Sequence, residues 1–253
     1  MSGAELVIVN NLQFPPHQRS VLQSLAGPST GWSPVLSELV VRPPGKIIAA
    51  GLNYRDHASE SEVAAPRSPI LFAKWPTCLV PDGAPIRIPV GVDEVDWEAE
   101  LAVVIGRTAR DVAADEALSY VEGYTCMNDV SARRIQREDG QWSRAKSFDS
   151  FGPIGPRLVP AAKIPDPQAL RIAARVNGDL MQDSNTQHMI FAVAELIAHA
   201  STGTTLLPGD IIATGTPAGV GAFRTVPIFL KHGDVVEIEV EGIGVLTNPV
   251  EQE

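Results

Sequence analysis

The chain has 253 residues, a formal net charge of −10 and 44% hydrophobic residues, which is enough to bury a substantial core in one large or two small domains. The acidic balance argues against a nucleic-acid or anionic-membrane surface, since both need a basic stripe. The start lacks a basic leader, no apolar run reaches the roughly 18 residues of a membrane helix, and the two cysteines lie in unrelated segments. We therefore expect a soluble cytoplasmic protein with neither a nucleic-acid nor a membrane partner.

Glycine and proline punctuate the whole chain. They total 42 residues, 21 of each, and are spread evenly, which is typical of many short strands joined by turns. The first of these breaks, at Arg42-Pro43-Pro44-Gly45, predicts a small N-terminal segment over residues 1–44 and a main domain over residues 45–253. The apolar run Lys46–Gly51 then predicts a short strand that leads into a polar loop.

The polar stretch after this strand contains a possible base. His57 and Glu60 are three residues apart, so on one turn of helix they would form a base and the acid that orients it. The alternative is an ion pair in solvent, which has little energetic value.

Residues 96–105 end in a β-branched apolar run and read as a strand. Asp96, Glu98 and Glu100 would then share one face, with Trp97 and Leu101 on the other. Like charges about 7 Å apart repel by roughly 2 kcal/mol at an effective dielectric near 20. Either water screens this face, or a cation sits over the two glutamates. The apolar strand that follows at once favours the cation.

A second polar cluster spans residues 128–136. Asp129 comes just before Ser131 and resembles the cap of a helix N-terminus, where a carboxylate binds free backbone amides. If that helix begins beside the acidic strand, Asp129 instead supplies a third oxygen ligand. Arg133 and Gln136 share one helical face and could hold a carboxylate. The competing interpretation is a solvated basic turn.

The remaining elements are short. We expect a helix from Asp115 to Val121 and a hairpin with a type I′ turn at Asn177-Gly178. An apolar face from Met189 to Ile197 predicts a helix that ends at Ser201-Thr202-Gly203. Alternation over Val236–Val240 predicts an antiparallel pair with the strand that follows Gly244, its glutamates facing water.

The loop Thr214–Gly221 is rich in glycine. Its amides could approach a ligand, as in an anion-binding nest, or the segment could be a plain turn. It lacks the lysine and the strand-then-helix context of a phosphate loop, which argues against nucleotide binding.

Together these motifs resemble the fumarylacetoacetate hydrolase superfamily over roughly residues 45–250. They occur in the family's order as Gly51-Leu52-Asn53-Tyr54 with His57 and Glu60, Asp96-Trp97-Glu98-Ala99-Glu100-Leu101, Asn128-Asp129 with Ser131-Ala132-Arg133, Lys146-Ser147-Phe148-Asp149, Val176-Asn177-Gly178 with Gln182 and Thr186, and Thr214-Gly215-Thr216-Pro217 with Gly219-Val220-Gly221. The resemblance implies an α+β, β-rich fold, a mixed β-sandwich or roll with a few short helices. It also implies a catalytic domain over residues 45–253 and a homodimer.

The resemblance further implies one divalent ion per subunit, Mg²⁺ or Mn²⁺, held by Glu98, Glu100 and Asp129. Oxygen-only ligation suits such hard cations. The catalytic residues that it implies are His57, Glu60 and Lys146. The residues that it implies for holding a small-molecule 2-oxo acid are Arg133, Gln136 and Thr216. We expect Lys74 to be structural, in the wall of the site.

Three functions follow from this assignment. The leading prediction is a metal-dependent hydrolase or decarboxylase that cleaves a C–C bond of a 2,4-dioxo or 2-oxo acid through a metal-bound enolate. The alternative is an isomerase or hydratase of unsaturated 2-hydroxy or 2-oxo diacids from aromatic catabolism. The third is a non-catalytic metabolite-binding protein. Residues 57–66 are a candidate lid, and residues 222–229 match no motif of the family.

Overall fold

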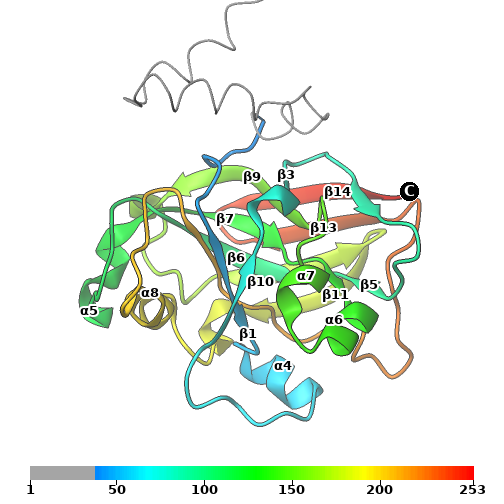
Figure 1. Cartoon of the computed structure of the whole chain (residues 1–253), viewed down its shortest axis with the longest axis horizontal. Coiled ribbons are helices and arrows are strands. Elements are labelled where there is room, and N and C mark those ends of the chain that lie inside the picture. Colours follow the sequence, from blue (N-terminus) through cyan, green and yellow to red (C-terminus); the bar gives the residue numbers. More distant parts are fainter. Residues whose placement is uncertain (1–37) are drawn as a thin grey trace, which may run out of the picture. The chain divides into compact units, whose positions relative to one another are not determined.

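The computed structural model describes residues 38–253 (Figure 1). The predicted N-terminal segment therefore lies mostly outside the described residues, and its boundary at residue 44 stays a prediction. Within residues 38–253, no helix is long and apolar enough to cross a membrane.

A seven-stranded mixed sheet forms one half of the described chain. Its strand order is β2 (Ile70–Lys74), β1 (Ile47–Gly51), β12 (Ile211–Ala213), β6 (Ala99–Ile105), β7 (Val121–Asn128), β9 (Gly152–Pro160) and β3 (Leu79–Val80). The β1–β12 and β3–β9 pairs are parallel and the other pairs are antiparallel. The predicted strand after Lys46 is thus confirmed as β1, near one edge of this sheet.

A five-stranded sheet packs against the first. Its order is β11 (Asp179–Asn185), β10 (Arg171–Val176), β13 (Val235–Val240), β14 (Gly244–Gln252) and β4 (Ile86–Ile88), while β5 (Val95–Asp96) and β8 (Ser131–Ala132) form a separate pair. β10, β13 and β14 contact β6, β7 and β9, and Leu101, Val103, Ile172, Ile238 and Leu246 are buried together in the core. Two curled sheets face to face confirm the predicted β-rich sandwich.

The helices are short, as predicted. They are α4 (Arg55–Glu60), α5 (Ala114–Ala117), α6 (Arg133–Asp139), α7 (Trp142–Ala145) and α8 (Val193–Ser201). Single 3₁₀ turns cover Pro76–Cys78, Leu118–Tyr120, Ala161–Lys163 and Thr186–His188. Figure 1 shows α6 and α7 as neighbours, with α4 at the end of β1.

Two predicted hairpins are confirmed. Asn177 and Gly178 have φ angles of 55° and 85°, the pair of positive values that a type I′ turn requires. β13 and β14 pair antiparallel, with Val236, Ile238 and Val240 buried between half-buried glutamates. In both cases the local sequence alone is sufficient, because turn chemistry and alternation act over a few residues.

Two helix predictions are only partly right. The helix expected from Asp115 to Val121 ends as a 3₁₀ turn at Tyr120, because Val121 already begins β7. The helix expected from Met189 begins only at Val193. Ile190 donates its amide to the Asn53 carbonyl at 2.7 Å, so this part of the chain is held in an extended connection.

The acidic strand also differs from the prediction. It is two strands, β5 and β6, interrupted at Trp97 and Glu98. The Trp97 amide donates to the Asp96 side chain and the Glu98 amide to the Asn128 side chain, so neither amide is free for a strand ladder. All of β6 is buried, which makes the prediction of a water-screened acidic face wrong.

Candidate metal centre and active site

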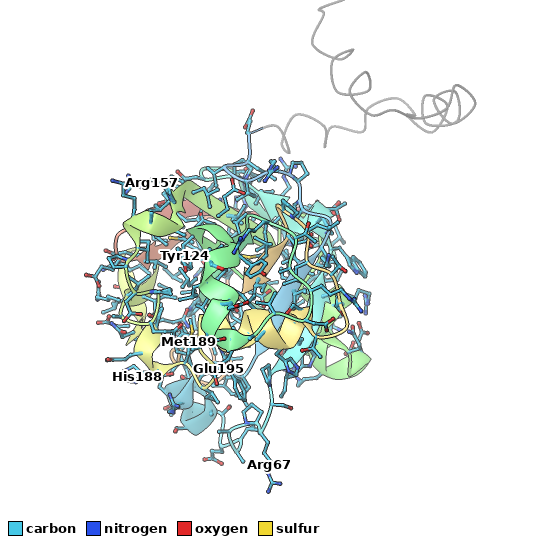
Figure 2. All side chains as sticks on the ribbon, turned by 90° about the vertical axis from the view of Figure 1, so that its left-hand side faces the viewer. Arg67, Tyr124, Arg157, His188, Met189 and Glu195 are labelled. Atoms are coloured by element: carbon cyan, nitrogen blue, oxygen red, sulfur yellow. The ribbon has the colours of Figure 1, made fainter. Side chains whose placement is uncertain are left out.

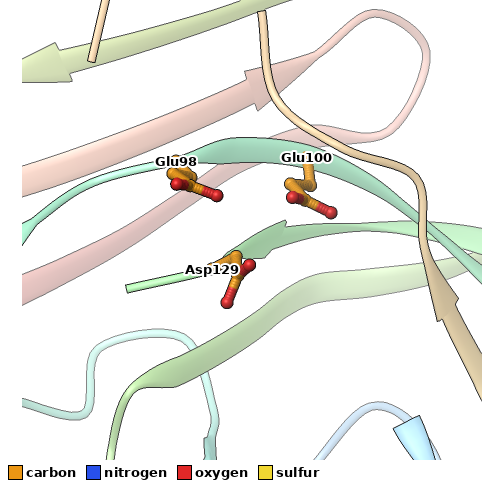
Figure 3. Close-up of side chains that lie close together, drawn as sticks. All are labelled: Glu98, Glu100 and Asp129. Atoms are coloured by element: carbon orange, nitrogen blue, oxygen red, sulfur yellow. The ribbon is translucent and has the colours of Figure 1, made fainter. Parts of the chain in front are cut away.

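Three buried carboxylates lie together beside β6. Glu98, Glu100 and Asp129 each offer an oxygen, and these oxygens all lie within 4.8 Å of one another. Glu98 and Glu100 point to the same side because they are two residues apart along the chain. The register of β6 and β7 pairs Ala99 with Asn128, which brings Asp129 next to the glutamates just past the end of β7 (Figure 3). The three predicted metal ligands are therefore brought together.

Asp129 is not a helix cap. α6 begins at Arg133 with Ala132 before it, while Asp129 lies in the connection between β7 and β8. Tertiary structure decides its role: its carboxylate accepts a hydrogen bond from Lys146 Nζ at 2.7 Å and forms an ion pair with Lys74 Nζ at 2.6 Å. Lys74 is fully buried, and its structural role in the wall of the site stays a prediction.

Basic side chains balance part of this negative charge. Lys146 Nζ lies 2.8 Å from Glu98, and Arg133 Nη1 lies 2.7 Å from the other oxygen of that carboxylate. Burial alone would raise the pKa of Glu98, but these two cations lower it to about 2. Glu98 is therefore ionised at neutral pH.

Glu100 has the opposite environment. Burial, together with the charges of Asp129 and Glu98, raises the pKa of Glu100 well above its ordinary value. Its Oε2 accepts the Gly215 amide at 3.0 Å, and no basic side chain among residues 38–253 forms an ion pair with it. A divalent cation would supply the missing positive charge, and three carboxylates are the donors that Mg²⁺ and Mn²⁺ prefer. The residues present thus fit such an ion.

The predicted His57–Glu60 pair forms on α4. His57 Nδ1 lies 3.2 Å from Glu60 Oε2, and the two side chains are only 10% and 19% exposed, so the interpretation as a solvent ion pair is wrong. Glu60 Oε1 in turn accepts the Gly219 amide at 2.9 Å. A carboxylate beside Nδ1 favours the tautomer with the proton there, which leaves Nε2 as a proton acceptor.

The glycine-rich loop binds the chain's own acids. Besides Gly215 and Gly219, which bind Glu100 and Glu60, the Gly221 amide donates to Asp96 at 2.7 Å. The loop is therefore no plain turn, and the amides of the predicted nest approach protein carboxylates.

Thr216 belongs to the same loop. Its hydroxyl accepts a hydrogen bond from Gln182 Nε2 at 2.8 Å. Gln182 also donates to the Pro217 carbonyl at 2.7 Å and accepts the Ala99 amide at 2.9 Å, so it ties this loop to the start of β6.

Arg133 is buried and almost fully engaged. Its Nε donates to Asp96 at 2.8 Å and its Nη1 donates to Gln136 at 3.1 Å, in addition to the contact with Glu98. Its Nη2 is buried and has no hydrogen-bond partner among the described residues. The interpretation as a solvated basic turn is wrong for this arginine, and Nη2 is a donor that a ligand oxygen could use.

A cavity of about 610 Å³ joins these groups. Six predicted site residues line it: His57, Glu98, Arg133, Gln136, Lys146 and Thr216. The other three, Glu60, Glu100 and Asp129, lie behind these and contact the lining residues or the loop. The apolar lining residues Ile70, Phe72, Trp142 and Phe223 were not predicted from the sequence, where no spacing or charge distinguishes them from core residues.

A β-sandwich with a buried carboxylate triad and a histidine–glutamate pair at one cavity defines a class of enzymes that act with a divalent metal. The chain belongs to the fumarylacetoacetate hydrolase family: residues 46–251 match the domain described as fumarylacetoacetate (FAA) hydrolase C-terminal.

Similar proteins carry several names. The chain is 50% identical to the mitochondrial oxaloacetate tautomerase fahd2 of Xenopus laevis, over 82% of this chain and 66% of that protein. It thus spans about two thirds of the length of that relative. Among solved structures, a 5-carboxymethyl-2-hydroxymuconate delta-isomerase from Mycobacterium smegmatis is 45% identical with a TM-score of 0.75, covering 83% of this chain and 80% of that one. A fumarylacetoacetate hydrolase from Exiguobacterium antarcticum is 41% identical with a TM-score of 0.79, covering 84% and 77%.

Proposed function

We propose that the protein is a divalent-metal-dependent enzyme of small 2-oxo acids, and that its reaction is keto–enol tautomerisation of oxaloacetate or a close analogue. The observation that carries this proposal is a single cavity lined by His57, Glu98 and an arginine with an unpartnered buried donor. The name of the Xenopus laevis relative supports the choice of reaction. Tautomerisation moves a proton from the carbon beside the carbonyl to the carbonyl oxygen, and the histidine–glutamate pair can take this proton and return it.

Glu98, Glu100 and Asp129 would hold the ion, which supplies a Lewis acid that stabilises negative charge on the keto oxygen. We propose Mg²⁺ or Mn²⁺, one per subunit.

His57 is the proposed base. With its Nδ1 proton held by Glu60, Nε2 can take a proton from the substrate carbon beside the carbonyl. Glu60 then stabilises the imidazolium, and the Gly219 amide fixes Glu60 in place. The chain thus supplies a base whose orientation depends on two successive hydrogen bonds.

The anionic ends of the substrate would bind polar side chains that line the cavity. Arg133, Gln136 and Thr216 all line the cavity, and Arg133 Nη2 has no hydrogen-bond partner among the described residues. Lys146 adds a positive charge beside Glu98, which would offset the charge that develops on the substrate.

Cleavage of a C–C bond is the second candidate. The same His57–Glu60 pair could activate water for hydrolysis of an acylpyruvate, and loss of carbon dioxide from oxaloacetate demands the same stabilisation of an enolate. The delta-isomerase from Mycobacterium smegmatis supports the further alternative of an unsaturated diacid isomerase.

The first test follows oxaloacetate by ultraviolet absorbance with Mg²⁺ or Mn²⁺, against a blank with metal but no protein. We expect keto–enol interconversion above the blank, and a loss of at least 100-fold in His57→Ala, the usual range for removing a general base. The control is His188→Ala, since His188 is exposed at the surface (Figure 2).

Product analysis separates the candidates. Interconversion without pyruvate indicates a tautomerase, pyruvate formed from oxaloacetate indicates a decarboxylase, and cleavage of acetylpyruvate indicates a hydrolase. Metal-dependent binding of oxalate with no turnover of any 2-oxo acid would favour the non-catalytic binding protein instead.

Assembly and location are proposals too. We propose a homodimer, which sedimentation would detect as twice the chain mass of 27.0 kDa. A single-chain mass would contradict it. We also propose a cytoplasmic location, in support of which Cys78 and Cys126 are both buried and free, as suits a reducing compartment.

A further inference from the structure

The cavity is larger than a four-carbon diacid needs. A cavity of roughly 150 Å³ encloses benzene, or about 25 Å³ for each of its six heavy atoms. By that measure oxaloacetate, with nine heavy atoms, would fill about 220 Å³. The cavity of about 610 Å³ would therefore keep more than half of its volume beyond such a substrate.

Apolar side chains form much of the rest of the wall. We call Val63, Ile70, Phe72, Trp142 and Phe223 the apolar subsite; all five line the cavity. All five are aromatic or β-branched, so they add apolar surface to a cavity that the charged groups of the site also line. Burial of apolar ligand surface against such a wall is favourable.

The apolar subsite begins at the reacting groups. The Phe223 ring lies edge-on to His57 with centroids 5.5 Å apart. On the other side, Lys146 Nζ lies 5.4 Å from the centre of the Phe72 ring, and Trp142 packs edge-on to Phe72 at 5.4 Å. Two aromatic walls thus lead outward from the proposed base and from the site lysine, so a ligand held between these groups would extend along them.

A neighbouring glycine leaves room for the Trp142 ring. A Cβ at Gly51 would overlap the Trp142 ring, so the absence of a side chain at the end of β1 lets the ring pack there. The backbone at the end of β1 therefore helps to set where the Trp142 side of the apolar subsite lies.

This part of the wall offers little to a second carboxylate. Besides His57, Arg133 and Lys146, the remaining basic residue that lines the cavity is Arg137, whose side chain is 62% exposed and whose Nη2 is paired with Glu94 at 2.6 Å. The far carboxylate of a long diacid would therefore have to share Arg137 with Glu94 or lie against apolar side chains, which is costly.

We propose that the preferred substrate is a 2-oxo acid with an apolar arm, alkyl or aryl, which occupies the apolar subsite. This inference rests on the proposed function for the 2-oxo acid end, and it adds the chemical class of the other end. Oxaloacetate is then a minimal substrate that fills only the inner part of the cavity.

The test measures the binding of N-alkyl oxamates, unreactive 2-oxo acid analogues, to the Mn²⁺-loaded protein by calorimetry. From N-ethyl to N-hexyl oxamate, affinity should rise roughly fourfold for each added methylene, the ratio expected for full burial of one methylene group. Oxamates of the same length that end in a carboxylate should bind more weakly.

Two matched variants test whether the alkyl arm of the ligand lies in the apolar subsite. Ile70→Ser places a polar side chain in the apolar subsite, and the gain per methylene should fall to below twofold. Val245→Ser is the control, since Val245 is also a strand residue, 39% exposed against 41% for Ile70, but does not line the cavity. Its gain per methylene should equal that of the unaltered protein.

Affinity that does not rise with chain length, tighter binding of the carboxylate-ended series, or an equal gain in both variants would each overturn the proposal. These outcomes are separate from the proposed reaction, because they concern binding of an unreactive ligand. Absence of oxaloacetate turnover, with a normal gain per methylene, would contradict the tautomerase alone.

Discussion

The carboxylate of Asp96 accepts hydrogen bonds from the amides of Trp97, Gly221 and Ala222 and from Arg133 Nε. It is fully buried, and it is not among the three clustered metal-ligand candidates. Its role is therefore to position other groups: it holds the arginine that faces the substrate and, through two amides, the end of the glycine-rich loop.

Asp96→Asn tests this role. The side-chain NH₂ group of the asparagine would point at some of the N–H groups that now donate to Asp96, and the negative charge that pairs with Arg133 would be lost. We therefore expect the free energy of unfolding to fall by about 3 kcal/mol. Urea unfolding measures the loss. The control is Asp93→Asn, which alters an ion pair with Arg134 whose aspartate side chain is 63% exposed and should cost less than about 1 kcal/mol. Equal losses in the two variants would contradict a special role for Asp96.

At the level of single residues, the sequence predicts the charged part of the site and not its apolar part. Glu98 and Glu100 are recognisable because acids directly before a buried strand are unusual. Phe223 carries no such signal. Its contact with His57 joins residues far apart in the chain, and nothing in the unmatched segment 222–229 distinguishes that phenylalanine from a surface residue.

Among the elements, the loop from Thr214 to Ala222 is the one that connects the separate parts of the site. Its amides reach Glu100 on β6, Glu60 on α4, and Asp96 on β5. It therefore holds three acidic side chains from three different elements with a single stretch of main chain.

Gly219→Ala should disturb this element. Gly219 has a φ of 102°, and a Cβ there would overlap the Met181 carbonyl oxygen, so the loop must move and its amide must leave Glu60. We expect a loss of at least tenfold in kcat and of about 1–3 kcal/mol in stability. Gly203→Ala is the control: its φ of 67° is also positive, but a Cβ there meets nothing within 4 Å. It should lose about 1 kcal/mol and keep its activity. Comparable kinetics in both variants would refute the role of this loop.

Element predictions succeed where the cause is local. The type I′ hairpin depends on two adjacent residues with positive φ, and Asn177-Gly178 supplies them. The cap predicted for Asp129 fails because its partners, Lys74 and Lys146, come from other parts of the chain. The early start predicted for α8 fails for the same reason, since Asn53 holds residues 190–191 extended.

On the scale of the whole molecule, the fold buries acidic side chains that need a counter-charge. Burial of Glu100 beside Asp129 and Glu98 is unfavourable without a cation. The packing that places β6 and β7 in the middle of the sheet thus links stability to metal binding.

Added Mn²⁺ should therefore stabilise the folded protein, by about 2.7 kcal/mol at an ion concentration of 100 times the Kd. Each kcal/mol of stabilisation should raise the melting temperature by about 2–4 °C. Because the ion competes with the proton on Glu100, whose pKa is raised, the apparent metal affinity should increase as the pH rises. Differential scanning calorimetry with and without chelator measures both effects.

Glu100→Gln is the matching variant. It should stabilise the metal-free protein, since it removes one of three crowded carboxylates, and it should abolish the shift with Mn²⁺. A full Mn²⁺ shift in this variant would rule out Glu100 as a ligand.

The loop from Thr214 to Ala222 has one more consequence, which concerns how the protein can change over generations. Its donors to Glu60, Glu100 and Asp96 are the peptide groups of glycines, so these contacts do not depend on any side chain of the loop. A substitution at Ala222 therefore removes none of these three donors. Ala222 also lines the cavity, so substrate preference can drift at that position while the base and the metal ligand stay in place.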